Sequence, residues 1–185
     1  MRVIAGDKKG RKLIAPDGLS TRPTSDKVKE ALFSIIQFDL PDAEFLDLFS
    51  GSGQMGIEAL SRGAKYAVFV DSGKKACDCI RQNLAATGLL GCGEVNMRNA
   101  QDYLISCRRK FDIVFMDPPY QEGLIEPIFE AVTRVTKDFG IIICEIPLGA
   151  EIIEEVNGFS LKRRYRYGKT ELALFRKQEA ETEIY

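Results

Sequence analysis

The chain has 185 residues, and its 45% hydrophobic and 29% charged content suits one globular domain with a sizeable core. No apolar run approaches the roughly 18 residues that span a bilayer, and the basic start lacks the apolar block of a signal peptide, so we expect a cytoplasmic protein with no membrane partner. Histidine is absent, and the five cysteines form no C-x-x-C pair. This composition excludes Ser-His-Asp and Cys-His catalysis, His-ligated zinc and a zinc ribbon, so no metal is expected.

Charge is segregated along the chain, although the net charge is only −1. Residues 1–30 carry a net charge of +4 and residues 161–177 a net charge of +6. Residues 31–160 carry −8, and the tail adds −3. An acidic body with two basic margins suggests a polyanionic partner at those margins, although an ordinary solvated surface is the alternative. We therefore predict nucleic acid as the partner.

The N-terminal part predicts a small basic hairpin followed by a helix. Residues 2–5 and 11–14 flank the turn-like segment GDKKG. Residues 25–38 place apolar side chains at helical spacing, and Thr24 or Ser25 is a suitable cap. The expected organisation is an N-terminal hairpin and helix at 1–40, a main domain at 41–177 and an acidic tail at 178–185.

From residue 44 onward, apolar runs alternate with helical patterns. The predicted strands are 45–49, 66–70, 94–98, 111–116 and 140–146. The predicted helices are 54–62, 74–87, 100–108, 124–136 and 150–157. Strands this apolar, separated by helices, indicate a parallel sheet covered on both faces. Two further strand-like runs around Gly168 predict an antiparallel hairpin at the sheet edge, so the fold class is a doubly wound α/β sheet with a C-terminal hairpin and a small N-terminal extension.

Three aspartates stand at the ends of predicted parallel strands. They are Asp47, Asp71 and Asp117. In such sheets the carboxyl ends of the strands share one rim, and ligands bind there near the point where the strand order reverses. We therefore expect the three carboxylates to converge on one site.

The segment DLFSGSGQMGIEA can serve two cofactors. Gly51, Gly53 and Gly56 spell the G-x-G-x-x-G of dinucleotide-binding loops, and Asp71 follows at the spacing of a ribose-binding acid. A dinucleotide would bring its pyrophosphate to this loop, where the carboxylate of Asp47 would repel it. S-adenosylmethionine brings an ammonium instead, which Asp47 can accept, so the loop favours S-adenosylmethionine over NAD.

The segment FDIVFMDPPYQEG indicates the chemistry. Asp117, Pro118, Pro119 and Tyr120 follow a core strand directly, and consecutive prolines fix the backbone while leaving their carbonyls as acceptors. A carboxylate, a proline carbonyl and an aromatic face suit a planar base that carries an exocyclic amine. The two acceptors would hold the amine with its lone pair toward a sulfonium methyl, and Tyr120 would stack on the ring.

These residues resemble a known family, the bacterial 16S rRNA (guanine-N2-)-methyltransferases of the RsmD group. The similar segments cover nearly the whole chain. They are MRVIAG, GRKL, RPTSDKVKEALF, LDLFSGSGQMGIEALSRGA, FDIVFMDPPY and RYGKTELALF. The middle motifs occur in many amino-methyltransferases, whereas the opening and closing segments are more specific. The resemblance implies a class I methyltransferase fold, S-adenosylmethionine as the cofactor and a guanine N2 in 16S rRNA, free or within the 30S subunit, as the acceptor.

The resemblance also implies roles for individual residues. Cofactor binding falls to Asp47, Ser50, Gly51, Ser52 and Gly53, to Asp71 in place of the family's usual glutamate, and to Asn99 and Ala100 in place of its Asp-Ala pair. Catalysis falls to Asp117, Pro118, Pro119 and Tyr120. RNA binding falls to Arg2, Lys8, Lys9, Arg11, Lys12 and Arg22. Arg22 and Thr24 belong to the R-P-T segment, which we expect near the rim of the site.

Three other functions compete with this interpretation. An adenine-N6 methyltransferase acting on DNA or RNA would use D-P-P-Y equally well, although no segment is long enough for a separate domain that recognises duplex DNA. An NAD-linked oxidoreductase would leave Asp47 and Asp117 without a role, and a non-catalytic RNA-binding module would not need Asp117. A monomer is the default expectation for the oligomeric state.

Overall fold

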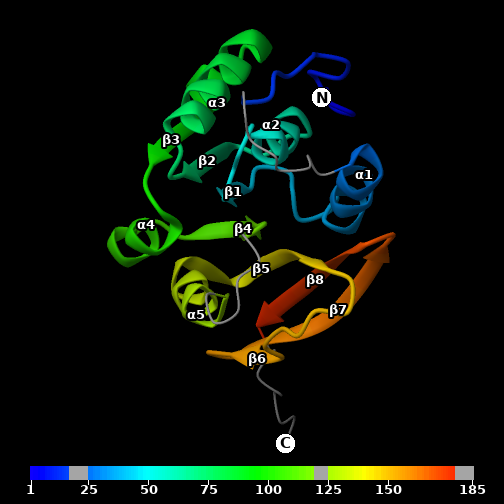
Figure 1. Ribbon diagram of the computed structural model, residues 1–185, viewed down its shortest axis with the longest axis vertical. Helices are drawn as coiled ribbons and strands as arrows, with labels where there is room; N and C mark the ends of the chain where they lie inside the picture. Colours follow the sequence, from blue (N-terminus) through cyan, green and yellow to red (C-terminus); the bar gives the residue numbers. More distant parts are fainter. Residues whose placement is uncertain (17–24, 119–124, 178–185) are drawn as a thin grey trace, which may run out of the picture.

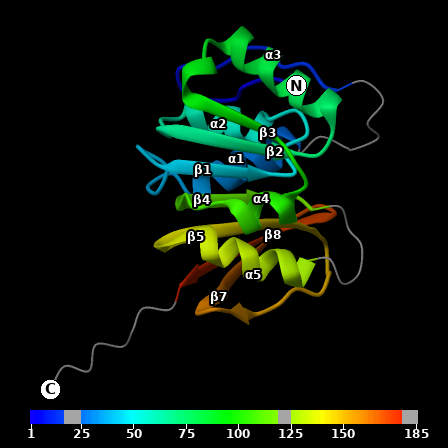
Figure 2. The same ribbon diagram turned by 90° about the vertical axis from the view of Figure 1, so that its left-hand side faces the viewer.

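The computed structural model describes residues 1–16, 25–118 and 125–177, which are built around one eight-stranded sheet. The strand order is β3-β2-β1-β4-β5-β8-β7-β6 (Figures 1 and 2). The parallel strands are β1 (Glu44–Leu48), β2 (Tyr66–Asp71), β3 (Gly93–Met97), β4 (Phe111–Met116) and β5 (Thr136–Pro147). None of the helices in the described ranges is both long and apolar enough to cross a membrane.

Helices cover both faces of the sheet, as the apolar strands predict (Figure 1). One face is covered by α1 (Asp26–Ile35), α2 (Gln54–Ser61) and α3 (Lys74–Thr87). The other is covered by α4 (Ala100–Ser106) and α5 (Ile125–Val135). Side chains of β1 alternate between the two cores, with Phe45 on the α2 side and Leu46 and Leu48 on the α5 side. This alternation places Asp47 on the side of α2.

The C-terminal hairpin extends the sheet in the antiparallel sense, as predicted. Strand β8 (Thr170–Lys177) pairs with β5, and β7 (Phe159–Tyr167) pairs with β8. The pairing continues to the short edge strand β6 (Glu155–Val156). The hairpin turns at Gly168, whose φ of 64° is a left-handed conformation that glycine tolerates best.

The helix predicted at 150–157 is wrong. Part of this segment forms β6, and the connection to β7 runs through Asn157 and Gly158, with φ values of 50° and 80°. Positive φ at both positions is the signature of a tight hairpin turn, and the Asn-Gly pair is a strong local signal for it. The turn chemistry and the open sheet edge therefore override the weak helical pattern. In the same region β5 begins at Thr136, earlier than the predicted residue 140.

The N-terminal extension forms a hairpin-like loop with little strand structure. A single antiparallel bridge joins Arg2 to Lys12. Helix α1 starts where predicted, because the hydroxyl of Ser25 accepts the Val28 N–H at 3.3 Å. Thr24 and the predicted acidic tail at 178–185 lie outside the described residues.

Candidate active site

A cleft of about 790 Å³ opens at the carboxyl ends of β1 and β4. Here the strand order reverses, because β2 and β3 lie on one side of β1 and β4 and β5 lie on the other. The N-terminal segment, the first turn of α1, the glycine loop, the end of β5 and the β7–β8 turn complete the walls. Asp47, Asp71 and Asp117 all line this cleft, as their positions at the strand ends require.

Asp47 is a buried carboxylate at the floor of the cleft, only 1% exposed. One of its oxygens accepts the N–H of Gly56 in α2 at 2.9 Å. Burial holds the pKa of Asp47 well above its usual range, and the nearby carboxylates of Asp71 and Asp117 raise it further. A bound cation would stabilise the charged form of this buried carboxyl, because it would give the carboxylate an ionic partner.

Asp71 at the end of β2 shapes the glycine loop. Its two oxygens accept the N–H groups of Gly51, at 2.9 Å, and Gly73, at 2.8 Å. The Ser50 hydroxyl accepts the Val70 N–H at 2.9 Å, which joins the loop to the same strand. An ionised carboxylate has about four lone-pair sites, so Asp71 retains acceptor capacity for a ribose diol at the cleft wall.

Glycine is required at two positions of the loop and the helix behind it. Gly53 has a φ of 74° and stands directly before α2. A Cβ on Gly56 would lie 2.3 Å from the ring of Phe69. Gly56 therefore lets α2 approach β2 closely, and this close packing brings the Gly56 N–H to Asp47.

The acceptor side of the cleft follows β4. Asp117 is open to the cleft, yet the cleft walls remove enough water from its carboxyl to raise its pKa to about 6. Pro118 is buried beside it and also lines the cleft. Pro119 and Tyr120 lie outside the described residues, so the predicted stacking contact of Tyr120 stays a prediction.

Asn99 and Ala100 are placed differently from the other predicted cofactor residues. Asn99 caps α4, because its side-chain oxygen accepts the Asp102 N–H at 2.8 Å and its amide donates to the Asp102 carboxylate at 2.7 Å. Ala100 is the first residue of α4, and its side chain is buried in the core. Neither is among the described residues that line the cleft, and Gly53 is not among them either. The adenine contact of Asn99 and Ala100 stays a prediction.

The N-terminal loop that carries the predicted RNA-binding cations contributes Met1, Ala15 and Pro16 to the cleft wall, whereas its tip is bonded through the Lys8 N–H to Ser61 at the other end of α2. Arg2 pairs with Asp26 at 3.4 Å, and both side chains are more than half exposed. The other described cations are largely or partly exposed, namely Lys8, Lys9, Arg11 and Lys12. Arg22 lies outside the described residues.

The cleft also contains residues that the sequence analysis did not select. Lys27 and Glu145 reach it from α1 and β5, and Tyr167 reaches it from the end of β7. Phe49 lines it with a φ of 62°, a strained conformation for a bulky residue that is typical of functional sites. Tyr167, Lys27 and Phe49 lie within the segments RYGKTELALF, RPTSDKVKEALF and LDLFSGSGQMGIEALSRGA that carry the family resemblance. No pattern in the sequence marked Glu145.

The cleft fits S-adenosylmethionine better than a dinucleotide. Its volume is that of a small-molecule site, and three aspartates face a ligand that carries an ammonium and a sulfonium. The same carboxylates would repel a pyrophosphate. The sheet order and the antiparallel final strands, together with this acid-lined cleft at the switch point, define a class I S-adenosylmethionine-dependent methyltransferase.

Comparison with known proteins identifies the family. The sequence profile of the family described as "Conserved hypothetical protein 95" matches residues 1–176. The chain is 38% identical over 183 residues to a Bacillus subtilis protein named "Putative rRNA methyltransferase YlbH", covering 96% of this chain and 100% of that one. It is 40% identical over 126 residues to the Escherichia coli "Ribosomal RNA small subunit methyltransferase D", covering 68% of this chain and 63% of that protein.

A solved structure agrees with these sequence relatives. The Escherichia coli protein described as "Putative methyltransferase yhhF" superimposes with a TM-score of 0.86 at 34% identity, covering 97% of this chain and 99% of that one. The chain therefore belongs to the "Conserved hypothetical protein 95" family, and its resemblance to the RsmD group is confirmed.

Proposed function

We propose that this protein transfers a methyl group from S-adenosylmethionine to the exocyclic N2 of a guanine in 16S rRNA. One observation carries the proposal: Asp47 of β1 and Asp117, directly after the neighbouring strand β4, line the same cleft. Asp47 pairs in register with Phe115, so Asp117 stands two residues further toward the rim. The carboxylate of Asp47 suits the cofactor's ammonium, and the carboxylate of Asp117 suits an amine at the mouth of the cleft.

The cofactor half of the cleft would bind through charge and hydrogen bonds. S-adenosylmethionine supplies an electrophilic methyl group on a sulfonium sulfur. Asp47 would hold the ammonium, and Asp71 would accept from the ribose hydroxyls. Both carboxylates are fixed in advance by backbone N–H donors, so little reorganisation is needed on binding.

The acceptor half would orient the guanine amine. The Asp117 carboxylate and the Pro118 carbonyl would each accept one N–H of the exocyclic amine, which leaves its lone pair directed at the methyl carbon. Transfer would form the new N–C bond as the C–S bond of S-adenosylmethionine breaks, and the carboxylate of Asp117 would take the released proton. Positioning of this kind accounts for most of the expected acceleration, and no histidine is needed.

The identity of the substrate rests on the relatives. A relative at 40% identity is named a small subunit rRNA methyltransferase, and residues of both basic margins, Met1 and Lys169 among them, line the cleft. We propose the assembled or partly assembled 30S subunit as the physiological partner, the cytoplasm as the location and a monomer as the active form. We also retain the division into residues 1–40, 41–177 and 178–185 as a functional proposal.

The replacement Asp117→Asn tests the proposal. It keeps the shape of the side chain but removes the charge that holds the amine. We expect transfer of labelled methyl groups to under-methylated 30S subunits to fall by about 10²- to 10⁴-fold, while S-adenosylmethionine binding by calorimetry changes little. Because the pKa of Asp117 is about 6, wild-type transfer should fall as the pH is lowered through that value.

Asp112→Asn is the matched control for this experiment. Asp112 lies on the same strand at the end far from the cleft, where it pairs with Lys137 at 2.8 Å. Its replacement should leave transfer unchanged. Recovery of N6-methyladenosine as the product would replace the guanine proposal with the adenine alternative. Full activity of Asp117→Asn would contradict the assigned role.

A further inference from the structure

The outer strand of the C-terminal hairpin presents basic and aromatic side chains on one face. Tyr165 and Tyr167 occupy alternate positions of β7, and both pack beside the core on the α1 side of the sheet. Arg163 stands two residues before Tyr165, and its guanidinium lies 5.2 Å from the centre of the Tyr165 ring. Lys169 follows at the hairpin tip and is exposed. We call Arg163, Tyr165, Tyr167 and Lys169 the β7 strip.

The positive charge of the β7 strip is available to a ligand. In the neighbouring positions the cations are compensated, since Arg164 and Arg166 pair with Glu171 and Arg176 pairs with Asp39. Within the described ranges, no carboxylate lies at ion-pair distance from the two strip cations or from exposed Lys162. These cations therefore carry much of the uncompensated charge of the hairpin.

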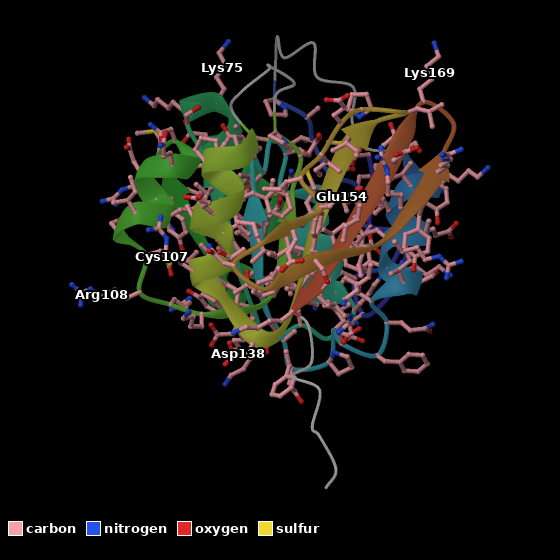
Figure 3. All side chains as sticks on the ribbon, turned by 90° about the horizontal axis from the view of Figure 1, so that it is seen from below. Lys75, Cys107, Arg108, Asp138, Glu154 and Lys169 are labelled. Carbon is pink, nitrogen blue, oxygen red and sulfur yellow. The ribbon has the colours of Figure 1, made fainter. Side chains whose placement is uncertain are left out.

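The β7 strip begins at the cleft. Tyr167 and Lys169 line the cleft, and Lys27 of α1 also lines it. Helix α1 and the hairpin lie side by side in Figures 1 and 3, and Asp39, just beyond α1, bonds Arg176 of β8 at 3.0 Å. Figure 3 shows Lys169 extending from the same end of the molecule as Lys75 at the start of α3. A chain that leaves the cleft on this side would run along β7.

We propose that the β7 strip is a second RNA-contacting surface, which holds a single-stranded segment of rRNA next to the target guanine. This inference rests on the proposed function. Bases would stack on the tyrosine rings and on the guanidinium of Arg163, while Lys162 and Lys169 would contact phosphates. Alternate residues of a strand lie roughly 6.5 Å apart, so successive platforms can contact successive unstacked bases.

The shape of the strip favours single-stranded RNA over a protein partner. The tyrosines are half-buried, so their rings are already ordered and lose little entropy on binding. Flanking cations without carboxylate partners suit a polyanion, whereas a protein surface without matching carboxylates would leave their charge desolvated. Stacking accepts any base, so the strip would add affinity near the target without selecting its sequence.

The double replacement Arg163→Ala with Lys169→Ala tests the inference. We expect binding to protein-free single-stranded 16S fragments that contain the target region to weaken by about tenfold at moderate salt. The slope of log affinity against log salt should become shallower by about two. The KM for 30S subunits should rise, while Arg163→Ala alone, at a position outside the cleft wall, should leave S-adenosylmethionine affinity by calorimetry unchanged.

The pair Lys65→Ala with Arg108→Ala is the matched control. Both residues are exposed cations outside the cleft wall, and Figure 3 shows Arg108 on a different side of the molecule from Lys169. Tyr165→Phe should retain RNA affinity and Tyr165→Leu should reduce it, because only the first keeps an aromatic face. The folded state of each variant is checked by thermal unfolding.

Three results would overturn the inference. If the strip variant binds RNA as tightly as the control variant does, the β7 strip is not an RNA-contacting surface. A loss confined to particles that carry ribosomal proteins would assign the strip to a protein partner. If Tyr165→Leu leaves the RNA affinity unchanged, the cations of the strip attract RNA by charge alone and no base stacks on Tyr165. If wild-type protein does not methylate 30S subunits, the proposed function fails instead, and RNA binding by the strip is judged separately.

Discussion

The two basic margins of the chain border the same cleft, but the fold holds them in different ways. The N-terminal loop, residues 1–16, has one strand bridge and is attached mainly through side chains of α2 and α3. The C-terminal hairpin is attached through a continuous backbone ladder to β5. One substitution can remove an attachment that a side chain makes. Most substitutions leave a ladder of backbone hydrogen bonds intact, because they do not change the backbone groups.

The N-terminal attachment depends on a buried carboxylate. Glu58 of α2 is fully buried and accepts the N–H groups of Ile4 and Ala5 at 2.8 and 2.9 Å. It also lies 3.6 Å from the ammonium of buried Lys29, which in turn donates to the Arg2 carbonyl at 2.7 Å. Burial lowers the pKa of Lys29, although Glu58 opposes this shift. The loop therefore completes an ionic cluster inside the protein.

A second attachment reaches the cofactor loop. Buried Asn83 of α3 accepts the Ile14 N–H at 2.9 Å and donates to the Ile14 carbonyl at 3.1 Å. Its amide also donates to the Ser52 carbonyl in the glycine loop at 2.9 Å. One side chain thus joins the expected RNA-binding loop to the expected cofactor-binding loop, and no equivalent link joins the C-terminal hairpin to the glycine loop within the described part of the chain. The two margins therefore differ in their coupling to the cofactor as well as in their attachment.

The largest effect is expected for Glu58→Ala. It leaves the buried ammonium of Lys29 without its carboxylate partner and releases two backbone donors, so the free energy of unfolding should fall by about 3–5 kcal/mol. Urea denaturation measures this loss, and hydrogen exchange should show faster exchange at Ile4 and Ala5. Glu58→Gln keeps the acceptor oxygen and should cost less. Unchanged exchange at those amides would mean that the loop is held by other contacts.

A smaller effect on stability, but a specific one on cofactor binding, is expected for Asn83→Ala. The Ser52 carbonyl loses a buried donor, which should cost about 1–3 kcal/mol. The KM for S-adenosylmethionine should rise several-fold, because the glycine loop loses a fixed contact. Gln82→Ala, at the exposed neighbouring position, is the control. A variant that loses stability but keeps the wild-type KM would show that Asn83 has only a structural role.

The smallest effect is expected for Glu171→Gln in the C-terminal hairpin. Glu171 is buried, but its partners Arg164 and Arg166 are 30% and 77% exposed and can be hydrated when the charge is lost. The backbone ladder remains intact, so we expect a loss of about 1–2 kcal/mol in urea denaturation. A loss as large as that of Glu58→Ala would break the contrast between the two margins.

Strong local patterns were sufficient to predict the parallel sheet and its helices. The residues that form β1, β2 and β4 are mostly apolar on both faces, and each strand has an aspartate within two residues of its carboxyl end. Asp47, Asp71 and Asp117 therefore lie on one cleft, as the order of elements requires. The helix predicted at 150–157 is wrong because its helical pattern competed with a strong Asn-Gly turn and an unpaired sheet edge.

Contacts between distant residues had no signal in the sequence. Glu58 and Asn83 each sit within a regular helical pattern, and the N-terminal residues that they hold lie more than 50 residues away. Lysine is a residue type that is almost never fully buried unless it is paired, yet the side chain of Lys29 is completely buried. The adenine contact of Asn99 stays a prediction, and its role as the cap of α4 is a separate feature that the structure shows.

The sequence by itself determined the class of fold and the acids at the strand ends, because periodicity and turn chemistry act over a few residues. Tertiary structure alone decided which side chains close the cleft, how the N-terminal loop is attached and which cations stay without carboxylate partners. These features depend on packing between segments far apart in the chain, where burial and charge compensation are set by the whole fold.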